Sequence, residues 1–153
     1  MENQETGVGS SGPTPVHLWI VGGLALLWNA FGSVDYTMSR MHNADYVRSM
    51  MPDSDPAAMF AYMDAMPGYA SIGWGLGIWA GLAGAILLLM RSRYAVHAFI
   101  ASLVGMALSF GYQLFDTAPP GEANNALIVA MIVGVGVLLL WYALRQRKVG
   151  VLR

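Results

Sequence analysis

Four long segments of the chain are almost continuously apolar, and away from their ends they carry no Asp, Glu, Lys or Arg. A bilayer core is crossed by about 20 residues of helix. Backbone in hydrocarbon must satisfy its own hydrogen bonds, and continuous apolar runs favour helices over the alternating strands of a barrel. The sequence therefore predicts an all-α, four-helix transmembrane bundle over residues 16–148, with spans at about 16–36, 69–90, 95–115 and 126–144.

The composition agrees with a membrane protein. Only 11% of the 153 residues are charged and 56% are apolar, whereas about 25% of an average soluble domain is charged. The net charge of −1 gives no indication of the positively charged surface that nucleic-acid binding needs. The absence of cysteine excludes disulfides and thiolate metal sites. The predicted partner is the lipid bilayer, and no cofactor is predicted.

The charged residues are sorted between the two sides of the predicted bundle. One side holds Glu2, Glu5 and six basic residues: Arg91, Arg93, Arg145, Arg147, Lys148 and Arg153. The other side holds Arg40, Arg48 and seven acidic residues: Asp35, Asp45, Asp53, Asp55, Asp64, Asp116 and Glu122. Because cytoplasmic loops carry the excess of Lys and Arg, we predict that both termini are cytoplasmic in a bacterial inner membrane.

The connecting segments have signals of their own. Residues 1–15 are polar and are predicted to be a disordered cytoplasmic tail, and residues 149–153 a basic cytoplasmic tail. Within the outer loop 37–68, Asp55 followed by Pro56 is typical of a helix start. A second short helix is expected within residues 39–51, and both helices could lie in the membrane interface.

Small residues recur at four-residue spacing in three of the spans, which lets helix backbones approach closely. They are Gly73, Gly77 and Gly81, with Gly84 three residues further on, Ala101 and Gly105, and Ala130 and Gly134. One interpretation is that these ridges are the seams of the bundle. The other is that a ridge left over once the bundle closes joins two copies of the chain.

Polar side chains near the outer ends of two spans are candidate ligand-binding residues, since polar groups within a membrane are often functional. They are Asn29, Asp35 and Tyr36 in the first span and Ser109, Gln113 and Asp116 in the third. If these two spans touch, the side chains would meet in a pocket open to the outside. Alternatively, Asn29 and Gln113 form interhelical hydrogen bonds, and the two Asp residues are solvated helix ends.

The outer loop is rich in methionine, and thioether ligands select Cu(I). The candidate metal ligands are Met38, Met41, His42, Met59, Met63 and Met66. The alternative is that methionine serves as an adaptable apolar residue on an interfacial helix. His17 and His97 lie near the inner ends of their spans, where a histidine is a proton-relay or metal candidate or a simple interfacial anchor.

No constellation of catalytic residues stands out, so the chain is predicted not to be an enzyme. Several segments share a pattern, namely His17-Leu18-Trp19, residues 27–32 with Asp35-Tyr36, Trp79-Ala80-Gly81, residues 87–89 with 91–95, and residues 140–143. This pattern resembles a group of small four-helix bacterial inner-membrane proteins of uncharacterised function, often labelled sugar transporters. The sequence thus favours a non-enzymatic accessory or oligomeric protein. The resemblance, over about residues 15–148, implies small-solute, possibly sugar, transport as an alternative, and the methionine-rich loop leaves copper binding open.

Overall fold

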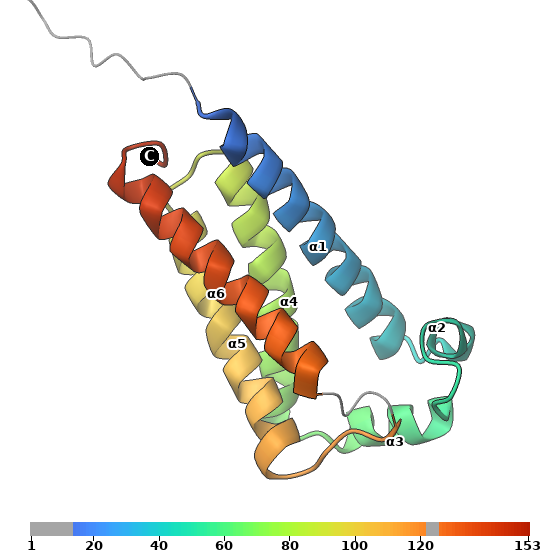
Figure 1. The fold of residues 1–153 in the computed structure, drawn as a ribbon. Coiled ribbons are helices and arrows are strands. Elements are labelled where there is room, and N and C mark those ends of the chain that lie inside the picture. Colours follow the sequence, from blue (N-terminus) through green and yellow to red (C-terminus); the bar gives the residue numbers. More distant parts are fainter. Residues whose placement is uncertain (1–13, 122–125) are drawn as a thin grey trace, which may run out of the picture.

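A computed structural model describes residues 14–121 and 126–153. Across these ranges the chain is helical (Figure 1), which confirms the predicted fold class. Its helices are α1 Val16–Arg40, α2 Ala44–Met50, α3 Pro56–Ala65, α4 Gly68–Leu89, α5 Ala95–Phe115 and α6 Ala126–Lys148. Within the described ranges, four helices (α1, α4, α5 and α6) are long and apolar enough to cross a membrane. The predicted disorder of the N-terminal tail falls mostly on residues 1–13, which lie outside the described residues.

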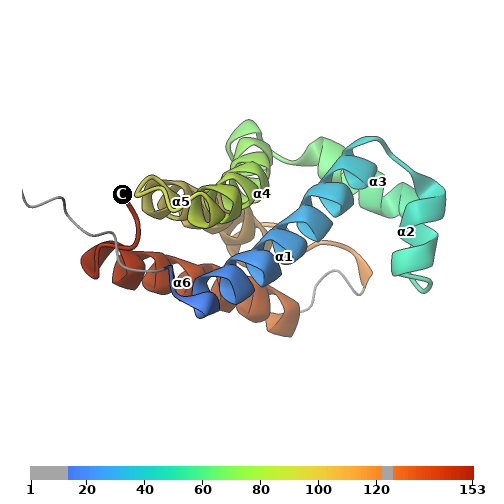
Figure 2. The same cartoon turned by 90° about the horizontal axis from the view of Figure 1, so that it is seen from above.

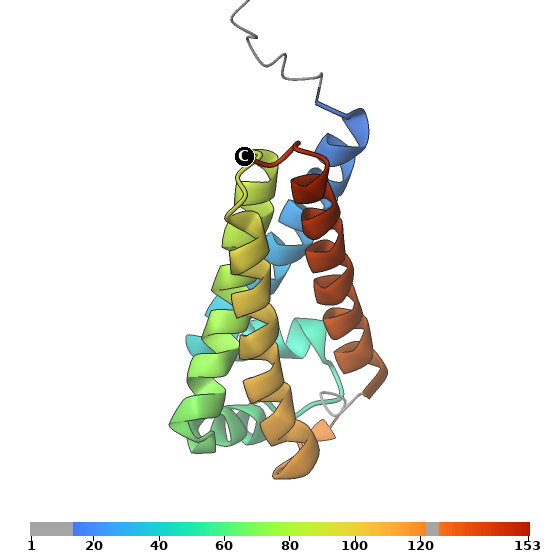
Figure 3. The ribbon, with the colours of Figure 1, turned by 90° about the vertical axis from the view of Figure 1, so that its left-hand side faces the viewer.

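The four long helices pack in the order α1, α4, α5, α6, with α4 between α1 and α5. Figures 2 and 3 show that α1 and α6 approach each other where α1 begins and diverge towards α2 and α3. We call the end that carries α2 and α3 the loop end. The opposite end, where α1 begins and α6 finishes, is called the basic end. It holds Arg91, Arg93, Arg145, Arg147, Lys148 and Arg153.

Helices α4 and α5 pack most closely of the four long helices, because glycines leave their interface without side chains. Gly73, Gly77 and Gly105 are all buried. A β-carbon on Gly105 would meet the backbone nitrogen of Gly77 and the carbonyl oxygen of Gly73, so this part of the seam is backbone against backbone. Such close approach is how small residues drive association in membranes, where the hydrophobic effect between helices is weak.

The outer loop folds onto the loop end as two short helices. The Asp55 carboxylate accepts a hydrogen bond of 3.0 Å from the backbone N–H of Ala57, which confirms the predicted N-cap of α3. The other short helix, expected within residues 39–51, forms as α2. It begins only at Ala44 because α1 itself continues to Arg40. Val47 of α2 is 1% exposed and packs against buried methionines of α3.

Residues 149–153, expected as a basic tail, fold back across the basic end. The backbone N–H of Arg93 donates to the carbonyl of Arg153, and the N–H of Arg153 donates to the carbonyl of Arg91, both at 2.8 Å. Leu152 is 4% exposed within the core cluster that includes Leu18 and Phe99. This segment therefore closes one end of the bundle.

Candidate functional site

The polar residues of α1 form a ladder within the helix. The side chains of Asn29, Ser33 and Thr37 each donate a hydrogen bond of 2.7–2.8 Å to the carbonyl one turn earlier. The Asn29 amide oxygen lies over Gly81 of α4, where a β-carbon would meet it. The hydroxyl oxygen of Ser102 on α5 lies 3.1 Å from the same place, and this hydroxyl donates a hydrogen bond of 2.6 Å to the carbonyl of Gly77. Asn29 and Ser102 therefore lie at the same level of the bundle.

The other predicted ligand residues of α5 lie elsewhere. Gln113 follows Ser102 by 11 residues, and a helix rises about 1.5 Å per residue, so the two are about 16 Å apart along the axis. Asp116 is the exposed C-cap of α5. Ser109 is 2% exposed and faces Gly73, and its hydroxyl has no hydrogen-bond partner among the described residues. The structure thus places Asn29 and Gln113 at different depths, with α4 between α1 and α5.

Asp35 and Tyr36 connect α1 to two different neighbours. The hydroxyl of Tyr46 on α2 donates a hydrogen bond of 3.0 Å to the Asp35 carboxylate. Burial, the charge of Asp35 and this hydrogen bond together raise the pKa of Tyr46 to about 12. Tyr36 packs edge-on against Trp74 of α4, with ring centres 4.8 Å apart. Both residues therefore tie α1 to its neighbours at the loop end.

The methionines of the outer loop are divided among several environments. Met59 and Met63 are buried against Val47, and Met66 belongs to a separate cluster with Tyr112. Met41 is 71% exposed, and the sulfur of Met38 accepts a 3.8 Å hydrogen bond from Asn43. His42 pairs with Asp64 at 3.2 Å and stacks on Phe60. The described residues contain no cluster of three His, Cys, Asp or Glu side chains suited to a metal ion.

The predicted small-residue ridges differ in what they meet. Gly73, Gly77, Gly81 and Gly84 all face neighbouring helices, whereas Ala101 is only half-buried. On α6, Ala130 is exposed, and among the described residues no other helix places an atom within 4 Å of the place for a β-carbon on Gly134. It is Gly136 of α6 that faces α5, where a β-carbon would lie 3.0 Å from the side chain of Leu103.

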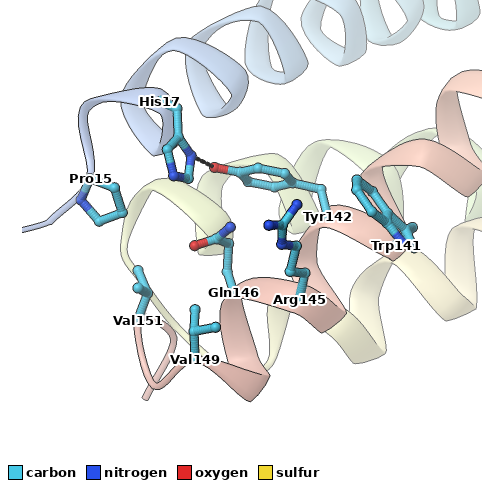
Figure 4. Close-up of a pocket in the computed structure, with 8 residues that line it drawn as sticks. All are labelled: Pro15, His17, Trp141, Tyr142, Arg145, Gln146, Val149 and Val151. Atoms are coloured by element: carbon cyan, nitrogen blue, oxygen red, sulfur yellow. Dashed lines mark hydrogen bonds between the residues drawn. The ribbon is translucent and has the colours of Figure 1, made fainter.

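A cavity of about 500 Å³ opens at the basic end between the start of α1 and the end of α6 (Figure 4). Its polar lining residues are His17, Tyr142, Arg145 and Gln146, and its apolar walls include Trp141 and Val151. The Tyr142 hydroxyl and the His17 Nδ1 are hydrogen-bonded at 2.6 Å. The guanidinium of Arg145 lies 5.8 Å from the centre of the Trp141 ring.

Gln146 is the residue of this cavity that sequence reasoning did not single out. Its side chain is 4% exposed, and its amide oxygen has no hydrogen-bond partner among the described residues. An unpaired buried polar group costs about 1–3 kcal/mol. In the sequence, Gln146 is the uncharged member of the run Arg145-Gln-Arg-Lys148, which is typical of a solvated helix end. The segment that folds back beyond α6 returns to this residue, since the backbone N–H groups of Val151 and Leu152 donate to the Gln146 carbonyl.

Comparisons with protein-family models, with curated proteins and with solved structures found no match for this chain. The helices establish a multi-pass membrane protein in contact with lipid. Its more specific role is proposed from the residues described above.

Proposed function

We propose that the chain is a non-enzymatic, multi-pass component of a bacterial inner membrane that assembles with a second copy of itself through α6. Both of its ends would face the cytoplasm, where the six basic residues of the basic end belong by the distribution of Lys and Arg. The observation that carries the proposal is the small-residue ridge of α6, since nothing in the described part of the chain lies within 4 Å of the place for a β-carbon on Gly134.

The spans differ in how far the monomer buries them. The proportion buried is 33% for the most apolar stretch of α4 and 17% for that of α6. Gly73, Gly77 and Gly105 are covered by the contact between α4 and α5, whereas Ala130 and Gly134 lie four residues apart with space beside them among the described residues. A ridge of this spacing lets two helices pack closely in lipid. It supports a dimer joined along α6.

The test is energy transfer between donor- and acceptor-labelled copies in liposomes, measured as lipid is added to dilute the protein. We expect transfer to persist in the native chain, and Gly134→Ile to weaken association about tenfold because its side chain fills the ridge. Ala107→Leu is the matched control, since Ala107 is an exposed small residue on a different spanning helix, α5. A native chain that dilutes to monomers, or equal association of Gly134→Ile and the native chain, would contradict the proposal.

A second candidate function is the small-solute transport that the sequence resemblance implies. It is favoured by Asn29 and Ser102, polar residues that approach each other over Gly81 inside the spanning helices. Uptake of radiolabelled sugars into proteoliposomes tests it, with Asn29→Leu expected to abolish uptake and Thr37→Val at the helix end to preserve it. Normal uptake by a correctly inserted Asn29→Leu variant would exclude this polar group as the transport site.

A further inference from the structure

The cavity at the basic end has a feature that α6-mediated assembly does not explain. Figure 4 shows Gln146 extending from α6 towards His17 at the start of α1, and Arg145 beside it extending towards the Tyr142 ring. The hydrogen bond between His17 and Tyr142 ties the two helices together at 2.6 Å and bounds one side of the space. The cavity, at about 500 Å³, is large enough for a small polar group with an apolar attachment.

The first indication of a ligand is Gln146. Its amide oxygen is buried and unpartnered among the described residues, although it belongs to the lining of an open cavity. The last torsion of a glutamine side chain is broad and roughly two-fold, so a half-turn about it exchanges the oxygen and the amide N–H₂ in front of a group in the cavity. An unsatisfied acceptor in this position calls for a donor such as a hydroxyl.

The second indication is the charge around the cavity. Each acidic residue that the structure describes belongs to the loop end: Asp35, Asp45, Asp53, Asp55, Asp64 and Asp116. The described ion pairs, His42–Asp64 and Arg48–Asp45, also lie in the outer loop. Arg145 forms no ion pair with a described carboxylate, and its planar guanidinium is suited to a two-point contact with phosphate.

The third indication is the position of the cavity in the bundle. It lies at the end of a spanning helix, beside Trp141 and Tyr142, and such aromatic residues are enriched at the level of lipid headgroups. Val149 and Val151 add apolar wall on the side of the folded-back segment. A ligand here would meet a cation and an amide beside an apolar surface.

We propose that this cavity binds a phosphate ester that carries a neighbouring hydroxyl group, as in a glycerophosphate headgroup. Arg145 contacts the phosphate, and Gln146 accepts a hydrogen bond from the hydroxyl. The pair formed by His17 and Tyr142 keeps α1 and α6 in place around the ligand. Two sources supply this chemistry, namely phosphatidylglycerol in the membrane and free glycerol phosphate in the cytoplasm.

The experiment uses the full chain in nanodiscs of phosphatidylcholine, with bound ligand counted by native mass spectrometry after release from the disc. One arm adds phosphatidylglycerol, a second adds phosphatidic acid, which lacks the hydroxyl, and a third adds soluble glycerol 3-phosphate. We expect phosphatidylglycerol or glycerol 3-phosphate to bind, and phosphatidic acid to bind less tightly. Binding in the first arm alone assigns the lipid, and binding in the third assigns the free ester.

Matched variants separate a built site from general attraction to positive charge. Arg145→Gln is expected to weaken binding about tenfold, because it removes the two-point contact. Arg147→Gln makes the same charge change at an exposed residue outside the cavity and should leave binding unchanged. Gln146→Leu should keep phosphate binding and lose the preference for the hydroxyl-bearing ligand. Equal losses for the two Arg variants, or no binding in any arm, would overturn the proposal.

Discussion

Gly105 of α5 lies directly against Gly77 of α4, so that a β-carbon added to Gly105 would be 2.9 Å from the α-carbon of Gly77. The neighbouring atoms are backbone, which cannot rotate away as a side chain can. The closest contact between two spanning helices is therefore possible only where neither helix presents a side chain.

Gly105→Ala is expected to destabilise the bundle by about 1–3 kcal/mol, the usual range for overpacking a tight contact. The matched control is Gly111→Ala in the same helix, where nothing lies within 4 Å of the new β-carbon. Reversible unfolding in mixed micelles, followed by circular dichroism, measures both variants. Equal stability of the two alanine variants would show that the glycine seam is not tightly packed.

Leu152→Ala is expected to cost about 2–5 kcal/mol, as large-to-small changes in cores do. Leu152 is 4% exposed, in a cluster with Leu18 and Phe99, so its loss opens the basic end. Val149→Ala serves as the control, because Val149 is 64% exposed. Hydrogen exchange at the Arg93 and Arg153 amides should increase in the first variant and stay unchanged in the second. Unchanged exchange in Leu152→Ala would mean that its side chain does not hold the segment in place.

The contact between Tyr46 and Asp35 predicts a dependence on alkaline pH. Burial, the Asp35 charge and the hydrogen bond raise the pKa of Tyr46 from 10.0 to about 12. Because the pKa of Tyr46 is higher in the folded than in the unfolded chain, Tyr46 contributes its full stabilisation below pH 10. This contribution is lost as the pH rises through about 12. Tyr46→Phe should remove this part of the alkaline loss of stability.

Tyrosinate absorbance measures that titration, with Tyr46→Phe subtracted from the native chain. Asp35→Asn removes one cause of the shift, so the Tyr46 midpoint should fall from about 12 towards 10.0. Tyr62→Phe is the control, because Tyr62 also has its pKa raised to about 12 but donates to the carbonyl of Thr117. If the Tyr46 midpoint is the same in Asp35→Asn as in the native chain, the charge of Asp35 does not contribute to the raised pKa of Tyr46.

The buried methionines of α3 predict a packing role. Met63→Leu keeps volume and polarity, so it should cost less than about 1.5 kcal/mol, whereas Met63→Ala should cost about 2–5 kcal/mol. Cu(I) titration of the full chain then separates packing from metal binding. We expect the native chain and Met63→Leu to give the same titration. Tight Cu(I) binding that Met63→Leu abolishes would favour the copper hypothesis.

The proposed orientation predicts which sites react from outside the cell. The chain has no cysteine, so each substitution introduces a unique label site. Asp53→Cys in the outer loop should react with an impermeant maleimide on intact spheroplasts, and Arg93→Cys at the basic end should react only after permeabilisation. Both native residues are exposed in the structure. The reverse labelling pattern would show that the basic end faces outward, opposite to the proposed orientation.

The sequence determined the number of spanning helices, because a continuous apolar run of bilayer length has one stable conformation in lipid. It also determined the start of α3, since Asp55 followed by Pro56 is a local signal that needs no tertiary contact. The glycines that form the α4 seam were recognisable for the same reason, through their spacing along one helix.

Only the tertiary structure decided which faces meet. In a membrane the lipid is as apolar as the core, so hydrophobic periodicity does not mark the buried side of a helix. The sequence therefore did not distinguish Gly134, which has open space beside it, from Gly136, which faces α5. Nor did it separate Asn29 from Gln113 by depth, because that follows from how α1 and α5 lie against α4. The burial of Gln146 likewise depends on a segment that returns from beyond the end of α6.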